Sequence, residues 1–165
     1  MNYRKTTLAL TYILAIAMVV WTLPLNSVEA SGDVPVKGSF GGNGIITVNY
    51  PYVHISTVGV GQMSHLGRTT FQSEIDVLIG PQAATGTFTF TAANGDTLTG
   101  TTSGIISPPD QLGVSEFDLT DTFTGGTGRF SGASGSVLVH GVSQATGPSS
   151  SVLQFTLGGT ISRLN

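Results

Sequence analysis

Apolar and polar residues alternate along most of the chain after residue 30, and apolar positions with helical spacing are almost absent. The clearest alternation is at residues 87–91, where Phe88 and Phe90 are separated and flanked by threonines. Because successive side chains of a strand point to opposite faces, this pattern predicts a strand with one apolar face. Asn94-Gly95-Asp96 follows and favours a hairpin turn, since its residues tolerate positive φ. Residues 97–99 then predict the returning strand.

Further strands are predicted wherever β-branched or aromatic residues alternate between turn signals. They cover residues 38–48, 53–60, 64–79, 100–106 (extending the hairpin), 114–123, 136–142 and 152–163. Prolines in Pro108-Pro109-Asp110 and Gly147-Pro148-Ser149 predict turns, because proline presets φ and donates no ladder hydrogen bond. Strands joined without helices have to pair antiparallel, and closing the sheet removes its exposed edges. The sequence therefore predicts an all-β fold, a closed antiparallel barrel of about eight strands.

Residues 1–30 differ in composition from the rest of the chain. Arg4 and Lys5 are followed by a long apolar stretch, and small residues precede a plausible cleavage point after Ala30. This order is typical of a secretory signal peptide. A retained membrane anchor is the alternative, because the apolar stretch approaches the ~18 residues that span a bilayer. We expect a signal segment followed by a single barrel domain at residues 31–165, secreted or periplasmic after cleavage, with membrane contact only through the signal.

Composition excludes several classes of function. Charged residues make up 9% of the chain and the formal net charge is −3, which provides no basic surface for nucleic acid. There is no cysteine, so a secreted domain of this length has to be stable without disulfides. His54, His65 and His140 are far apart and lack metal-ligand spacing. Residues 125–128 are not followed by the Lys-Ser/Thr pair of a phosphate-binding loop. We therefore expect neither a metal nor a cofactor.

A glycine-rich run connects the strand at residues 114–123 to the next strand. It reads Thr124-Gly125-Gly126-Thr127-Gly128-Arg129-Phe130-Ser131-Gly132-Ala133-Ser134-Gly135. Glycine takes up positive φ at turns and bulges without steric penalty, whereas it disfavours a helix. The run resembles the T-G-G-T-G-[KR]-F-x-G-A-x-G sequence of the small barrels related to allene oxide cyclase and the plant dirigent proteins, and every fixed position is matched.

The resemblance implies a fold and a kind of chemistry. Barrels of this group have eight antiparallel strands around a largely apolar cavity and resemble calycins; the plant enzymes are often trimers, which implies a possible homo-oligomer here. Allene oxide cyclases close a fatty-acid-derived epoxide into a ring, and dirigent proteins steer radical coupling or quinone-methide cyclisation. Both act mainly by holding a reactive apolar molecule in one conformation. A scaffold does not by itself fix a reaction.

Strand parity singles out two polar residues on apolar faces. On residues 64–79, His65 shares the face of Phe71 and Ile75, which directs His65 into the barrel and Arg68 out of it if the register is unbroken. A bulge at Gly67 would reverse this assignment, because one inserted residue exchanges the two faces. On residues 114–123, Asp121 lies on the apolar face. A carboxylate inside a barrel has to be paired, hydrogen-bonded to backbone or protonated.

Two interpretations of Asp121 stay open. In the structural one, Asp121 pairs with Arg129 or caps the turn amides of residues 125–128. In the functional one, Asp121 and His65 are acid and base groups at a cavity mouth, and Arg129 or Tyr52 orients a carboxylate or carbonyl of the ligand.

Three functions are compatible with the sequence. The favoured one is an exported barrel that binds a small apolar molecule in its lumen without chemistry. The second is a cyclase or isomerase that orients a reactive apolar substrate, and the third is a structural or surface module without a ligand. Inward-facing phenylalanines either meet at the centre or leave a void for the ligand: Phe71, Phe88, Phe90, Phe117 and Phe155.

Overall fold

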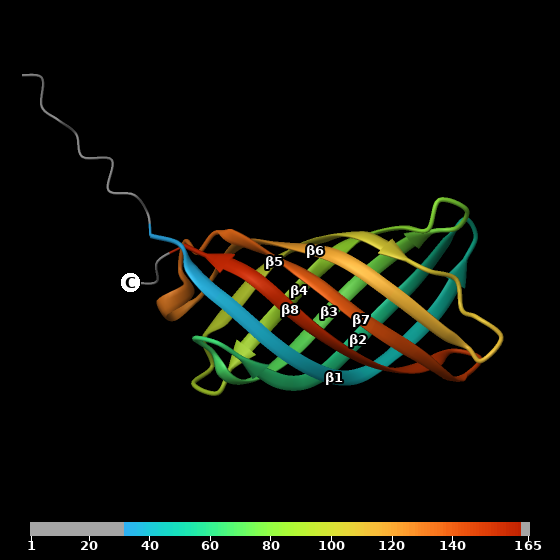
Figure 1. Ribbon diagram of the computed structural model, residues 1–165, viewed down its shortest axis with the longest axis horizontal. Coiled ribbons are helices and arrows are strands. Elements are labelled where there is room, and N and C mark those ends of the chain that lie inside the picture. Colours follow the sequence, from blue (N-terminus) through green and yellow to red (C-terminus); the bar gives the residue numbers. More distant parts are fainter. Residues whose placement is uncertain (1–31, 163–165) are drawn as a thin grey trace, which may run out of the picture. The chain divides into compact units, whose positions relative to one another are not determined.

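The computed structural model describes residues 32–162, which form a closed antiparallel barrel of eight strands (Figure 1). Each strand pairs with the next along the chain, and the last pairs with the first to close the sheet. The strands are β1 (Val34–Asn49), β2 (Tyr52–Met63), β3 (Gly67–Leu78), β4 (Ala83–Ala92), β5 (Thr97–Ile106), β6 (Val114–Gly126), β7 (Gly135–Gly147) and β8 (Ser150–Ile161). The predicted all-β closed barrel is confirmed, whereas the predicted signal at residues 1–30 lies outside the described residues.

The predicted hairpin is confirmed as β4, a tight turn and β5. Gly95 in this turn has a φ of 89°, which glycine adopts without strain. The Asn94 side-chain oxygen accepts a hydrogen bond from the backbone N–H of Asp96 at 3.1 Å. Phe88 and Phe90 are buried inside the barrel, as the alternation with threonine predicts.

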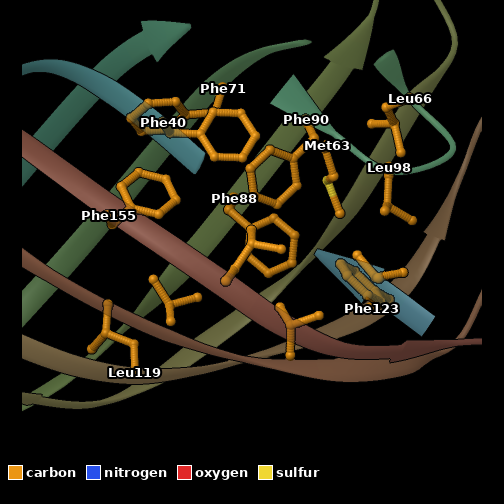
Figure 2. Close-up of a cluster of buried hydrophobic side chains, with 14 of the residues drawn as sticks. Phe40, Met63, Leu66, Phe71, Phe88, Phe90, Leu98, Leu119, Phe123 and Phe155 are labelled. Carbon is orange, nitrogen blue, oxygen red and sulfur yellow. The ribbon is translucent and has the colours of Figure 1, made fainter. Parts of the chain in front are cut away.

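Phenylalanine rings fill much of the barrel interior. Figure 2 shows Phe40, Phe71, Phe90 and Phe155 pointing toward one another from four different strands. The rings of Phe40 and Phe155 stack with centroids 5.1 Å apart, and Phe71 meets Phe155 edge-on at 5.0 Å. These are favourable aromatic geometries, so the rings stabilise the barrel beyond the area they bury.

Several of these rings lie beside a glycine of the neighbouring strand. The cross-strand pairs are Phe40–Gly61, Phe71–Gly59, Phe88–Gly100, Phe117–Gly141 and Phe155–Gly141. A Cβ built on Gly100 would come within 2.5 Å of the Phe88 ring atom Cζ. Glycine at these positions therefore leaves the space that an aromatic ring needs inside a narrow barrel.

One end of the barrel carries the β2–β3, β4–β5 and β6–β7 connections, and we call it the closed end. Leu66, Phe130 and Ala133 come from these connections and are buried. Phe130 belongs to a 3₁₀ turn at Gly128–Phe130, and Gly128 and Gly132 on either side have φ values of 55° and 73°. The glycine-rich run thus lets the chain turn sharply and bury Phe130 at the closed end. We call the opposite end, with the β1–β2, β3–β4, β5–β6 and β7–β8 connections, the open end.

Candidate functional site

A cavity lies inside the barrel toward the open end, and we call it the lumen cavity. Its volume is about 120 Å³. Its walls include Ile46, Ile106 and Ser115, which lie where their strands meet the open end and are only half-buried. The cavity therefore reaches solvent at this end.

Most of the cavity wall is apolar. Aromatic and aliphatic side chains lining it are Ile46, Ile55, Phe71, Ile75, Phe88, Phe90, Ile106, Phe117, Leu119, Val139, Leu153 and Phe155. The polar lining side chains are six hydroxyls and one carboxyl, from Thr57, Ser73, Thr102, Ser115, Ser143, Ser151 and Asp121. A mostly apolar cavity with a few polar groups is the usual composition of a small-molecule site.

Asp121 is the one ionisable side chain among the described residues that line the cavity. It lies in the middle of β6, its side chain is on the lumen face, and the residue is only 5% exposed. Across the sheet it faces Thr102 on β5 and Val137 on β7. Within residues 32–162, no ion pair reaches its carboxyl group, and the Thr102 hydroxyl is the side-chain group close enough to influence it.

The environment of Asp121 changes its acidity. Burial raises the pKa of Asp121 from its ordinary value of 3.8 to about 6, and the neighbouring Thr102 hydroxyl partly opposes this rise. Desolvation has this direction because a low-dielectric interior disfavours the charged form of a carboxyl group. Asp121 is therefore able to take up and release a proton close to neutral pH.

The hydroxyl groups of the cavity differ in how well they are bonded. Thr57 and Ser73 bond to each other across β2 and β3. By contrast, the buried Thr102 Oγ1 has no hydrogen-bond partner within the described part of the chain. A buried hydroxyl without a partner costs folding free energy. A buried carboxyl group without an ion pair and an under-bonded hydroxyl thus lie side by side in the wall.

The predicted Asp121–Arg129 pair is wrong. Arg129 lies within the 3₁₀ turn at the closed end, where its Nε is 4.0 Å from Asp96 Oδ2 and its guanidinium is 5.0 Å from the centroid of the Phe130 ring. Because the 3₁₀ turn buries Phe130, the adjacent Arg129 is directed outward. Capping of the turn amides by Asp121 is not found either, since Asp121 lies inside β6 rather than at its end.

The predicted inward position of His65 is also wrong. The parity argument assumed a strand from residue 64, but β3 begins at Gly67 and His65 lies in the β2–β3 turn with a φ of 67°. The side chain is exposed at the closed end, where Nε2 is 3.0 Å from the carbonyl oxygen of Pro35. His65 and Asp121 therefore do not form an acid–base pair.

The other predicted binding residues divide into two groups. Phe71, Phe88, Phe90 and Phe117 all line the lumen cavity. Tyr52 is the first residue of β2, is 47% exposed and does not line the cavity. The role of all five residues in binding a ligand stays a prediction. Sequence reasoning missed Thr102, whose signal was a polar residue at an inward position of β5, where Leu98 and Gly100 share its face.

A second group of polar side chains lies on the outer wall. His54 Nδ1 is 2.9 Å from Asp76 Oδ1, and His54 Nε2 is 3.0 Å from Glu74 Oε2. The hydrogen bond that His54 Nδ1 donates to the Asp76 carboxylate raises the pKa of His54 above its usual 6.5. Within residues 32–162, no three or more histidine, aspartate or glutamate side chains are arranged to hold a metal ion. No helix in this part of the chain is long and apolar enough to cross a membrane.

No family model, curated protein or solved structure shows significant similarity to this chain. The resemblance to allene oxide cyclase and dirigent barrels therefore depends on residues 124–135, and the closed barrel is the part of that expectation which the structure shows. A function has to be argued from the lumen cavity itself.

Proposed function

We propose that the barrel binds a compact apolar molecule in the lumen cavity. One observation carries the proposal: about 120 Å³ stays unfilled at the open end of a barrel that aromatic rings otherwise pack. Protein interiors are normally close-packed, with few voids larger than a water molecule. Removing apolar ligand surface from water is favourable by roughly 25 cal/mol per Å². A cavity with this lining is therefore able to bind a ligand without any charged contact.

The cavity volume limits the size of the ligand. An apolar protein cavity of roughly 150 Å³ is large enough for benzene, whereas drug-sized ligands occupy sites of about 300–1,000 Å³. The lumen cavity, at about 120 Å³, is suited to one ring or a short branched chain. A longer molecule fits only with its remainder outside the open end.

Filling the cavity with a larger side chain tests this function. Val139 on β7 lines the cavity, and the next residue before it, Leu138, points outward and is exposed. We expect the wild-type protein to bind toluene in a calorimetric or NMR titration. Val139→Phe should abolish binding, because the added ring occupies the cavity, and the matched control Leu138→Phe should bind as the wild type does.

Two results would contradict the proposal. Absence of toluene binding by the folded wild-type protein would favour a structural module without a ligand. If the wild-type protein and Val139→Phe are both shown to be folded by circular dichroism and bind toluene equally, toluene binds elsewhere.

A cyclase or isomerase is a second candidate, and Asp121 is the observation that favours it. A carboxyl group with a pKa of about 6 in an apolar cavity is suited to general acid–base catalysis near neutral pH. The wall would hold the substrate in one conformation, as orientation catalysis requires. The assay is chiral analysis of the product formed from a small unsaturated epoxide. An enantiomeric excess that disappears in both Asp121→Asn and Val139→Phe supports catalysis, and a racemic product with the wild type rejects it.

Two sequence features extend the proposal beyond the cavity. The signal-like segment at residues 1–30 supports export, and the run at residues 124–135 supports kinship with allene oxide cyclase and dirigent barrels, whose plant enzymes are often trimers. Native mass spectrometry of protein recovered from an exporting host tests both features. We expect a chain that begins at Ser31 and an assembly of three copies; full-length chain in the membrane fraction would contradict export.

A further inference from the structure

We infer that the ligand of the lumen cavity is a small apolar amine, whose ammonium group binds between the Asp121 carboxylate and the Thr102 hydroxyl. This inference rests on the proposed function, because it specifies the ligand of the same cavity. It starts from a buried carboxyl group that has no ion pair within the described residues and from the under-bonded hydroxyl beside it. Asp121 and Thr102 are directly opposite each other on β6 and β5, and both are more than nine-tenths buried.

The charge of the wall selects the charge of the ligand. Asp121 is the single titratable group among the described lining residues, and its neighbours across the sheet, Thr102 and Val137, carry no charge. The described cations, Lys37, Arg68 and Arg129, all have exposed positions on the outer side of the barrel. An anionic ligand would therefore meet a like charge, whereas a cationic ligand would neutralise a buried one.

Hydrogen bonding favours the same chemistry. A carboxylate is an acceptor, and a threonine hydroxyl accepts as well as donates. An ammonium group offers three donors, enough to satisfy Asp121 and Thr102 Oγ1 together, and charge-assisted bonds of this kind are roughly twice as strong as neutral ones. A hydrocarbon ligand would leave Thr102 Oγ1 without a further partner and the Asp121 carboxylate without a counter-charge.

The rest of the wall suits the remainder of an amine. Phe71, Phe88 and Phe117 line the same cavity. The faces of aromatic rings attract cations, most strongly where water is excluded. The volume of about 120 Å³ limits the apolar part to one small ring or a short branched chain, and the opening to solvent leaves room for the rest of the molecule. The ligand class is thus a monocyclic or short branched primary amine.

The test compares three molecules of nearly the same shape: benzylamine, benzyl alcohol and toluene. At pH 7.5 we expect the wild-type protein to bind benzylamine at least about tenfold more tightly than the other two, a difference typical of one charge-assisted hydrogen bond. Asp121→Asn should lose this preference and still bind toluene, which shows that the variant is folded. Thr102→Val should weaken benzylamine binding about threefold relative to toluene binding.

The pH dependence of benzylamine binding provides an independent test. Because Asp121 has a pKa of about 6, benzylamine binding should weaken about tenfold from pH 7.5 to pH 5, while toluene binding stays constant. Toluene binding without a preference for benzylamine overturns the amine inference and leaves the proposed function intact. An unchanged preference in Asp121→Asn also overturns it. If none of the three molecules binds, the proposed function itself fails.

Discussion

Asp121→Asn should make the protein more stable at neutral pH, although it alters the centre of the candidate site. Asp121 is 5% exposed, and no ion pair within the described residues reaches its carboxyl group. A carboxylate in such a place destabilises the native state, because its ionised form loses hydration without gaining a counter-charge. Asparagine has nearly the same shape and no charge, so the substitution removes this cost without creating a cavity.

The pKa determines both the sign and the size of the effect. Between pH 3.8 and about 6 the native state binds more protons than the unfolded chain, so the free energy of unfolding falls as pH rises through this window. A pKa raised from 3.8 to about 6 corresponds to about 3 kcal/mol, at about 1.4 kcal/mol for each pH unit. The wild-type protein should lose this stability between pH 3.8 and 6, and Asp121→Asn should not.

Urea unfolding at a series of pH values measures this difference. The gap in unfolding free energy between Asp121→Asn and wild type should widen by about 3 kcal/mol from about pH 3.5 to about pH 7.5. Glu116→Gln is the matched control, because Glu116 lies on β6 with an exposed side chain. Its effect should stay within about 0.5 kcal/mol. A gap between Asp121→Asn and wild type that is independent of pH would refute the argument that Asp121 is desolvated.

Three further predictions concern the rest of the barrel. Gly100→Ala should destabilise the protein by about 1–3 kcal/mol, since the new methyl group would overlap the backbone oxygen of Thr122 and the Phe88 ring. Gly158→Ala should be nearly neutral, because nothing lies within 4 Å of its Cβ position. Equal denaturation midpoints for the two variants would contradict this. Phe130→Ala should lower the free energy of unfolding by about 3–5 kcal/mol, because Phe130 is fully buried at the closed end. Arg129→Ala should lower it by less than about 1 kcal/mol, because the ion pair of Arg129 is partly exposed. A larger loss for Arg129→Ala would restore a structural role for that residue. The His54 ring should titrate with a midpoint above pH 6.5 in an NMR titration. Its contacts with the two carboxylates then stabilise the fold at acidic pH, and this stabilisation is lost as pH rises through the raised pKa. A midpoint at or below pH 6.5 would contradict this prediction.

The barrel was predictable because its pattern is local. Alternation such as that around Phe88 and Phe90 fixes which residues face inward within a strand, and parity correctly directs Asp121 into the lumen. Parity fails where a strand ends. His65 was assigned a direction by extending β3 through the β2–β3 turn, and Arg129 was paired inward without knowing which neighbour the 3₁₀ turn buries.

The surroundings of Asp121 were not predictable from parity, because they depend on the register between strands. A bulge between Thr99 and Gly100 shifts the pairing of β5 with β6, and the shifted register places Thr102 opposite Asp121. One residue of shift exchanges inward and outward neighbours. The volume of the lumen cavity likewise depends on how rings from several strands pack, which no single strand specifies.

The effect of Asp121 on the free energy of unfolding depends on whether the proposed ligand is bound, and this dependence is testable. A ligand that binds only the native state stabilises it, and one that pairs with the carboxylate also lowers the pKa of Asp121. Saturating benzylamine at pH 7.5 should therefore stabilise wild type more than Asp121→Asn and narrow the difference between them. Toluene should stabilise both proteins equally and leave the difference unchanged. If benzylamine also leaves it unchanged, the ammonium group does not reach Asp121, and the buried carboxylate is a cost that amine binding does not offset.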